Sequence, residues 1–465
     1  MHPGTKTSLV LGKSVARASR ALKLGGGSTF PGRAARWVYP QFISMMVKRL
    51  PLGCALITGT NGKTTTSTLL ASMLDRAGMT PVHNHTGANL LTGIASALVN
   101  ESDTSGNMAG RIGLFEVDEA VLPAAITEAS PRLVLVNNLF RDQLDRYGEL
   151  DTLAAKMKKA IEDLDPNSTV ALNADDPLVA SIGCGLEQEV IYYGINDRRY
   201  ASDETQHAAD SKHCASCGGR LDYDYYLFGH LGGYRCPECG FERPETTVSA
   251  TEVEMLGMKG TRCVLRFAGG GAELHIPLPG LYNVYNVLAA LAAALALGVE
   301  PDVALGAIED FSAAFGRVER ISASGREVFM ILAKNPAGFN EVIRTLTREP
   351  GGKSVMLALN DNIADGRDVS WIWDVDFEMF RDRLDNVVCS GIRAWDMALR
   401  LKYAGLDGVS PATEPNLEKA FDLALESVAP GETLYVIPTY TAMLELRGAF
   451  VRRGLVTPFW KNRQQ

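Results

Sequence analysis

Long apolar runs are missing from this 465-residue sequence: none approaches the roughly 18–20 residues that a helix needs to cross a bilayer. Cysteine is scarce, with eight residues in the whole chain, which excludes a secreted scaffold held together by disulfides. The net charge of −8 argues against a broad nucleic-acid-binding surface. The length instead predicts two or three domains with a large buried core, and the cysteine usage indicates the reducing cytoplasm.

Acidic residues are absent from residues 1–50, although the chain as a whole is acidic. A basic, acid-free start is compatible with a transit peptide. We favour a basic amphipathic helix from about Leu9 to Leu24, which would touch anionic lipid weakly, at about 1 kcal/mol per basic residue near the surface. The basic residues of this segment are Lys6, Lys13, Arg17, Arg20, Lys23, Arg33, Arg36, Lys48 and Arg49. We therefore assign residues 1–50 to a basic N-terminal helical segment.

A glycine-rich turn separates the apolar run at 54–57 from a predicted helix at about 64–77. Such a turn offers backbone N–H groups and a helix N-terminus to an anion, with Lys63 placed for the β/γ-phosphates and Thr64 for Mg²⁺. Ile57 stands where the strict phosphate-loop motif has its first glycine, so the match is to a shorter form. A turn used only for tight packing is the alternative. We predict ATP binding by Gly59, Thr60, Asn61, Gly62, Lys63, Thr64 and Thr65.

Short apolar runs alternate with amphipathic segments after this loop, which is typical of a parallel sheet with helices on both faces. Predicted strands at 111–118, 133–138 and 169–173 end in acids or asparagines. Ligands of such sheets bind beyond the carboxyl ends of the strands. Glu116, and less directly Asp118, could therefore complete a Mg²⁺ site beside the loop, although solvated loop acids show the same pattern.

Two Cys-x-x-Cys pairs interrupt the α/β pattern at residues 205–245, with 18 residues between them. Cys214, Cys217, Cys236 and Cys239 have the spacing of a tetrahedral zinc site, and a strand predicted at 220–227 fits a zinc ribbon. Four thiolates leave no open position, so we expect a structural zinc; a redox pair is the competing interpretation. The remaining Cys54, Cys184, Cys263 and Cys389 are expected to be small core residues.

The α/β pattern resumes with an Ala/Leu-rich core helix at 287–297 and, after 316, with four more apolar strands. Those strands are predicted at 327–334, 354–360, 386–389 and 433–437. The predicted organisation is a central ATPase domain at 51–316, with the zinc ribbon inserted at 205–245, and a smaller Rossmann-like α/β domain at 317–465.

Several motifs together resemble the Mur ligase superfamily, whose members use ATP to activate a carboxylate as an acyl phosphate and then form an amide. They are GTNGKTT at 59–65, the strand-end Glu116, NADDP at 173–177, PGLYNVYN at 279–286, GRVE at 316–319 and AKNP at 333–336, in place of the usual AHNP. The inserted zinc ribbon, AKNPAG at 333–338 and the stretch 359–373 are most similar to the MurT family. The resemblance covers nearly the whole chain.

Site residues follow from this resemblance by position. Glu116 would bind Mg²⁺, and Lys63 would stabilise the transferring phosphoryl group. Asn283 would lie near the adenine, unless it caps its helix, and Arg317 near the phosphates or ribose, unless it pairs with Glu319. The chain departs from the superfamily at Asp142-Gln143, where Asp-His is usual. Lys156 matches a commonly carbamylated lysine only with a gap, and a solvated helix lysine is the better interpretation.

MurT-like proteins pair with GatD, a class I glutaminase, to amidate the D-glutamate α-carboxylate of lipid II. The resemblance therefore implies a GatD-like partner that supplies ammonia, and a lipid II substrate at the inner membrane leaflet. It also implies that the catalytic aspartate Asp368 completes a Cys-His-Asp arrangement with the partner's residues, with Asp361 and Asp365 as alternatives. Trp371 and Trp373 are expected to anchor the interface. Only about 50 residues precede the phosphate loop, so we expect no Mur-type N-terminal substrate domain.

Two other functions stay open at this stage. A Mur-type or folylpolyglutamate-type ligase would add an amino acid and need no glutaminase. A nucleotide-regulated adaptor would use the zinc ribbon to bind nucleic acid, which the acidic balance and the lack of a basic stretch around the cysteines disfavour.

Overall fold

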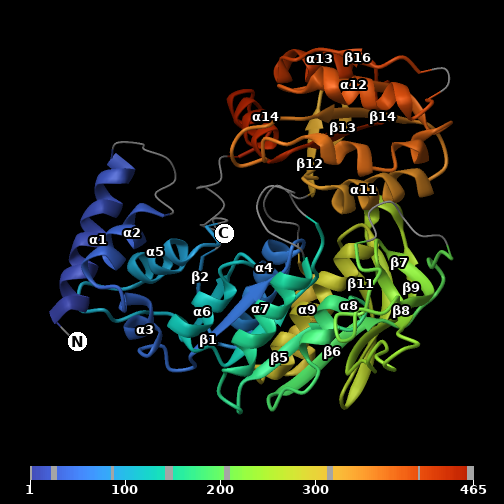
Figure 1. Cartoon of the computed structure of the whole chain (residues 1–465). Helices are drawn as coiled ribbons and strands as arrows, with labels where there is room; N and C mark the ends of the chain where they lie inside the picture. The colour runs from blue at the N-terminus through green and yellow to red at the C-terminus, as the bar shows by residue number, and fades with distance from the viewer. Residues whose placement is uncertain are drawn as a thin grey trace.

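The computed structural model describes residues 3–21, 29–84, 88–141, 150–203, 210–311, 318–406 and 409–457. Its described residues form a large α/β body that carries an N-terminal helical unit and the zinc-ribbon hairpin, and a smaller α/β body built on a separate sheet (Figure 1). Among these residues, no helix combines the length and the apolar character that a membrane crossing requires.

The central sheet contains nine described strands in the order β11-β10-β9-β6-β5-β4-β1-β3-β2. The strands from β2 to β9 pair in parallel, whereas β9, β10 and β11 form an antiparallel edge. Their bounds are β1 (Cys54–Thr58), β2 (Pro81–His83), β3 (Ile112–Glu116), β4 (Leu133–Val136), β5 (Thr169–Asn173), β6 (Glu189–Ile195), β9 (Val248–Met255), β10 (Thr261–Phe267) and β11 (Gly270–Ile276). The predicted parallel α/β sheet is confirmed.

Successive side chains of β1 alternate between the two layers of helices, as the two-residue period of a strand requires. Ala55 and Ile57 pack into the core with α4 (Lys63–Arg76), α9 (Leu281–Ala296) and α10 (Pro301–Glu309). Cys54 and Leu56 pack into the opposite core, which α5 (Leu91–Glu101), α6 (Leu122–Ala129), α7 (Leu150–Glu162) and α8 (Pro177–Ile182) cover. Burial on both faces explains why the parallel strands read as unbroken apolar runs.

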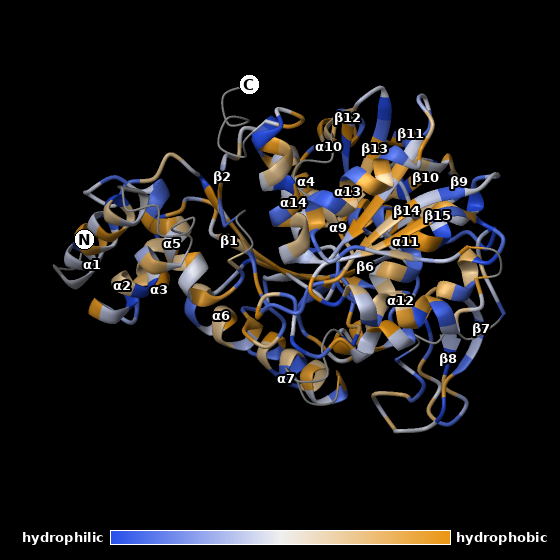
Figure 2. Cartoon of the chain, turned by 90° about the horizontal axis from the view of Figure 1, so that it is seen from above, coloured by the Kyte–Doolittle hydropathy of each residue, from blue (hydrophilic) through white to orange (hydrophobic). Residues whose placement is uncertain are grey.

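The N-terminal unit consists of α1 (Pro3–Ala21), α2 (Phe30–Val38) and α3 (Phe42–Val47), which pack on α5 at one end of the molecule (Figures 1 and 2). Helix α1 begins six residues before the predicted start at Leu9, and its predicted end lies outside the described residues. Helix α9 likewise begins earlier than predicted, at Leu281, because Gly280 turns the chain there with a φ of +87°.

The smaller body has six described strands in the order β12-β13-β17-β14-β15-β16, all parallel except for the β12–β13 pair. The strands are β12 (Val318–Ala323), β13 (Arg326–Ile331), β14 (Lys353–Ala358), β15 (Leu384–Ser390), β16 (Ala412–Thr413) and β17 (Thr433–Pro438). One face packs on α11 (Pro336–Arg348), α12 (Ala394–Tyr403), η2 (Ser370–Asp374) and η3 (Phe377–Phe380), and the other on α13 (Leu417–Glu426) and α14 (Tyr440–Arg452).

Contrary to the prediction from the sequence, the four cysteines outside the Cys-x-x-Cys pairs are not all buried. Cys54, Cys263 and Cys389 are buried, and burial raises the pKa of each thiol to about 12. Cys184 is exposed, so the prediction that it is a core residue is wrong. The reason is its position in the glycine-flanked turn after α8, where the chain leaves the core.

Candidate active site

The phosphate loop connects the carboxyl end of β1 to the first turn of α4. Gly59 and Gly62 have φ values of +132° and +83°, in the region that favours glycine. A Cβ on Gly62 would lie 2.0 Å from Oδ1 of Asn286, so α9 packs directly against the loop. The loop leads directly into the N-terminus of α4, which suits an anion.

Lys63 is buried in the first turn of α4, where its Nζ lies 3.1 Å from Oε2 of Glu119. The same ammonium donates to the carbonyl oxygen of Gly59 and, at 3.5 Å, to that of Thr60. The charge of the lysine is therefore compensated within the chain. Sequence reasoning missed Glu119, because its only signal was a position three residues beyond a strand-end acid.

Glu116 ends β3 directly beside β1, where it is the register partner of Ile57. Its Oε1 accepts a hydrogen bond of 3.2 Å from the Thr64 hydroxyl, and Asn84 bonds both its backbone N–H and its carbonyl oxygen at 2.8 Å. Its Oε2 is buried and has no hydrogen-bond partner among the described residues. An unpaired carboxylate oxygen beside a threonine hydroxyl fits the oxygen ligands that Mg²⁺ takes. Asn84 gave no signal in the sequence.

Asn137 and Asn138, which follow β4, form hydrogen bonds with the phosphate loop and with the first turn of α4. Asn138 accepts from the Asn61 N–H at 2.9 Å, and its own carbonyl oxygen accepts from Thr60 N–H at 2.9 Å. Asn137 donates to the Thr66 hydroxyl at 3.1 Å. These residues belong to the polar strand end after β4, at the carboxyl edge of the sheet where ligands of such folds bind.

Asn283 is buried in the first turn of α9, where its Nδ2 donates to the Pro279 carbonyl oxygen at 2.7 Å. It is not the cap of the helix, because Gly280 occupies that position. Its Oδ1 accepts from Asn286 at 3.0 Å, and Asn286 in turn contacts Thr66 of the loop. Asn283 thus belongs to the polar shell around the phosphate loop.

The smaller body reaches this loop through Asn335, which caps the N-terminus of α11 by accepting from the Gly338 N–H at 2.9 Å. Its Nδ2 donates to Oδ1 of Asn61 at 3.0 Å, across 274 positions of sequence. The N-termini of α4 and α11 therefore lie at one place, and both carry the positive end of a helix dipole. Figure 1 shows α11 on the face of the smaller body that is turned to the larger one.

Several predicted site residues cannot be placed here. Arg317, Asp142 and Gln143 lie outside the described residues. Glu319, the predicted alternative partner of Arg317, accepts from Arg447 Nε at 3.1 Å. Lys156 is exposed on α7, in a groove between α6 and α7.

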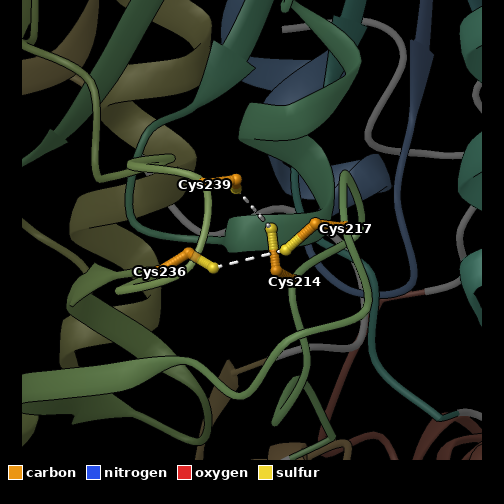
Figure 3. Close-up of side chains that lie close together, drawn as sticks. All are labelled: Cys214, Cys217, Cys236 and Cys239. Carbon is orange, nitrogen blue, oxygen red and sulfur yellow. Dashed lines mark hydrogen bonds between the residues drawn. The ribbon is translucent and has the colours of Figure 1, made fainter.

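The four cysteines predicted to bind zinc converge in space (Figure 3). All four Sγ atoms lie within 4.8 Å of one another, and the pairs Cys214–Cys239 and Cys217–Cys236 are 3.6 and 3.5 Å apart. Zn–S bonds of about 2.3 Å in a tetrahedron place sulfurs about 3.8 Å apart, so the cluster is compatible with zinc. The predicted strand forms β7 (Asp222–Phe228), which pairs with β8 (Leu231–Arg235) in a hairpin.

The NADDP segment at 173–177 connects the β7–β8 hairpin to the large body through hydrogen bonds. Asp175 is fully buried and accepts from Arg243 Nε, from the Tyr285 hydroxyl at 2.7 Å and from the Ile195 N–H at 2.9 Å. Burial, followed by the charge of Asp175, raises the pKa of Tyr285 well above its usual range. The Tyr234 hydroxyl donates to the carbonyl oxygen of Ala174 at 3.0 Å. The ribbon, the sheet and α9 therefore share one polar network, which the sequence motif did not reveal.

Three carboxylates lie on the loop after β14, at the carboxyl edge of the smaller sheet. Asp361 pairs with Arg393 at 2.8 Å, and Asp365 is buried, where it accepts from the backbone N–H and the hydroxyl of Thr441. Asp368 is partly exposed and accepts from the Ser370 N–H at 2.8 Å. That bond lowers the pKa of Asp368, which keeps it charged at neutral pH.

Large apolar side chains are exposed around this loop, and we call them the apolar patch. Its residues are Ile363, Trp373, Ile392, Trp395, Leu399 and Tyr403. Three of them recur every four residues along α12, and the rings of Trp373 and Tyr403 are 5.6 Å apart. Trp371 is buried against Phe339, so the prediction that it anchors an interface is wrong, because its ring fills the core beneath η2.

The two mainly parallel sheets, the phosphate loop and Glu116 define a protein of the Mur ligase fold. Residues 57–232 match the family described as Mur ligase middle domain, and residues 332–443 match MurT ligase C-terminal. The solved structure of a pseudomurein peptide ligase type C from Methanothermus fervidus superposes with a TM-score of 0.66 at 23% identity, over 86% of this chain and 79% of that one. The fold of this class implies ATP and Mg²⁺.

Two curated relatives identify the family within this fold. The MurT subunit of lipid II isoglutaminyl synthase from Streptococcus pneumoniae is 33% identical over 93% of this chain and 94% of the relative. The MurT subunit from Staphylococcus aureus is 31% identical, over 94% and 95%. The chain belongs to the MurT family.

Proposed function

We propose that this chain is the synthetase subunit that amidates the D-glutamate α-carboxylate of lipid II to D-isoglutamine during peptidoglycan synthesis. A carboxylate oxygen bonds to the γ-phosphorus of ATP and ADP leaves. Ammonia then forms the C–N bond of the amide, phosphate leaves with the C–O electron pair, and the proton that the nitrogen loses passes to the departing phosphate. The observation that carries the proposal is Glu116, whose Oε2 is buried without a partner beside Thr64 and the phosphate loop. The named substrate comes from the relatives.

The residues of the site have distinct roles in this reaction. Lys63 would exchange its bond with Glu119 for the β/γ-phosphates and stabilise the charge on the transferring group. Glu116 and the Thr64 hydroxyl would hold Mg²⁺, which neutralises phosphate charge when bound. Asn335 would keep the smaller body against the loop, so that water is excluded from the activated carboxylate. Asn283 and Arg317 remain the proposed contacts for the adenine and for the ribose or phosphates.

The nitrogen would come from a second protein. A GatD-like class I glutaminase would dock on the apolar patch and release ammonia there. Asp368 is the carboxylate best suited to orient the partner's catalytic histidine, because Asp361 and Asp365 are already engaged with Arg393 and Thr441. The size of the apolar patch, with two tryptophans and a tyrosine exposed, supports a protein interface.

The same function has consequences for location and domains. The chain would act in the cytoplasm, at the inner membrane leaflet where lipid II is presented, and it would bind no nucleic acid. Its domains would be the N-terminal segment at 1–50, the central domain at 51–316 with the ribbon at 205–245, and the C-terminal domain at 317–465. Zinc would stiffen the ribbon and take no part in the chemistry.

A reconstitution tests the proposal. The purified chain with its glutaminase, ATP, Mg²⁺, glutamine and lipid II should give lipid II that is lighter by the exchange of one hydroxyl for one amino group, as read by mass spectrometry. The chain without the glutaminase should give the same product with ammonium chloride. If an amino acid is added instead, or if no amide forms with either nitrogen source, the proposal is wrong.

A further inference from the structure

Helix α2 exposes an aromatic and basic face. Phe30 is 54% exposed and Trp37 83% exposed, and Arg33 lies between them on the same side. The three residues recur at i, i+3 and i+7, which places them on one stripe of a helix. Pro31, Gly32 and Ala35 form the opposite, buried side. An exposed tryptophan and phenylalanine on one short helix call for a binding partner.

Helix α1 lies beside α2 and adds positive charge to the same end of the molecule. Its exposed stripe contains Lys6, Val10 and Arg17, again at helical spacing. Its buried side contains Leu9 and Gly12, and a Cβ on Gly12 would lie 3.0 Å from Val99 of α5. Because α1 and α2 both turn their buried sides to α5, their exposed stripes point away from the large body.

The charge of this unit is opposite to that of the chain as a whole. Residues 1–50 contain nine basic and no acidic residues, within a chain of net charge −8. One of the nine, Arg36, is paired with Glu128 of α6 at 2.6 Å. A basic helical face with tryptophan and phenylalanine is what an anionic bilayer surface binds, because lipid headgroups attract the charges while the rings enter the boundary with the acyl chains.

We infer that the exposed stripes of α1 and α2 are a membrane-contact face for an anionic lipid surface. The inference deepens the proposed function and rests on it for its biological role, because it would bring the chain to a lipid-linked substrate. The geometry agrees with this role. Gly32, the third residue of α2, donates its backbone N–H to Ser96 Oγ at the middle of α5 at 2.8 Å, and a Cβ on Gly32 would lie 2.1 Å from the carbonyl oxygen of Thr92 in the first turn of α5. Helix α5 starts at the carboxyl edge of the sheet that bears Glu116, and Leu90 is exposed there. Phe30 therefore lies toward the edge that carries the site.

The test is co-sedimentation of the full chain with vesicles that contain no lipid II. The chain should bind vesicles of phosphatidylcholine mixed with phosphatidylglycerol, more weakly as salt rises, and should bind pure phosphatidylcholine several-fold less. The double substitution Phe30→Ser/Trp37→Ser should lower the partition coefficient at least tenfold. Arg33→Gln should lower it about fivefold, as expected for one basic residue at the surface. Trp395→Ser, an exposed tryptophan of the smaller body, is the matched control and should leave the partition coefficient unchanged.

Three results would overturn the inference. The first is equal vesicle binding by the wild type and the double variant. The second is equal binding to anionic and neutral vesicles. The third is a dimer of the chain in solution that Trp37→Ser dissociates, which would assign the face to a second copy. Each variant should keep wild-type ATP binding, which shows that it folds. Because the vesicles hold no substrate, vesicle binding without amidation of lipid II would contradict the proposed function and leave the membrane-contact face standing.

Discussion

The phosphate loop and the Asp368 loop both lie at the carboxyl edge of a parallel sheet, yet they are built in opposite ways. Lys63 and Glu116 are buried, and at the loop three buried side-chain atoms, Thr58 Oγ1, Asn61 Nδ2 and Glu116 Oε2, have no hydrogen-bond partner among the described residues. Asp368 is partly exposed, bonded to the Ser370 N–H and bordered by the apolar patch. A site for a small, charged ligand needs an enclosed, preorganised surface, whereas a residue that serves a second protein must stay accessible. In the proposed function, the chain would therefore enclose the phosphate chemistry and leave the residue that serves the nitrogen-supplying partner accessible.

The largest expected effect comes from Lys63→Met. We expect ATP-dependent amidation to fall at least about 10³-fold, because no other cation is placed for the β/γ-phosphates among the loop residues. The substitution should also destabilise the fold by about 3–5 kcal/mol, since it leaves Glu119 buried and unpaired. Lys63→Met/Glu119→Gln should restore the unfolding temperature and leave the chain inactive. Activity in the double variant would show that the loop is not the site of phosphoryl transfer.

Zinc removal should lower the unfolding temperature of the large body and leave that of the smaller body unchanged. The hairpin packs into the core of the large body, so chelation or Cys236→Ser should lower the unfolding temperature of that body by about 10 °C or more. The unfolding of the smaller body should stay where it is. Calorimetry together with elemental analysis measures both. A full complement of zinc in Cys236→Ser would contradict the four-cysteine site.

Glu116→Gln separates function from stability at a single position. Amidation should fall about 10²-fold because the metal loses a charged ligand. The unfolding temperature should stay the same or rise, since Glu116 Oε2 already lacks a partner in the folded chain. Steady-state kinetics across Mg²⁺ concentration and a melting curve test this. A variant that is both active and destabilised would make Glu116 a structural residue.

Asp368→Asn should affect only the nitrogen supply. Glutamine-dependent amidation should fall at least tenfold, whereas amidation with ammonium chloride should be unchanged, because the phosphate loop is untouched. The unfolding temperature should also be unchanged, since Asn accepts from Ser370 as Asp does. In the wild type, the hydrogen bonds of Ser370 lower the pKa of Asp368, so its charge is lost only at a more acidic pH than that of an ordinary aspartate. Equal losses with both nitrogen sources would remove the cross-subunit role.

The smallest effect is expected from Asn335→Ala, which removes a helix cap and the bond to Asn61. A cap is worth about 0.5–2 kcal/mol, so the unfolding temperature of the smaller body should fall by a few degrees. The KM for ATP should rise several-fold as the two bodies separate more easily. Asn335→Asp keeps the acceptor for the cap and loses the donor to Asn61, so it should change KM and not the unfolding temperature.

The elements that depend on contiguous sequence motifs agree with the prediction. The positions of β1, α4, β5 and the two Cys-x-x-Cys pairs depend on residues within a few positions of each other, where glycine torsions, strand periodicity and ligand spacing act directly. The predictions for Cys184 and Trp371 are wrong because burial depends on which surface a neighbouring element covers. A sequence motif does not show which neighbouring helix or loop will cover a given side chain.

A phosphate loop, a strand-end carboxylate, a four-cysteine cluster and an acid-free N-terminal segment can be recognised in the sequence alone, since each is a local pattern with its own chemistry. The folded chain is needed to show that Glu119 pairs with Lys63, that Asn335 contacts Asn61 and that Asp175 joins the ribbon to α9. The fold also shows which of Asp361, Asp365 and Asp368 stays accessible. These choices depend on contacts between residues tens to hundreds of positions apart, and such contacts exist only once the sheets have brought their carboxyl edges together.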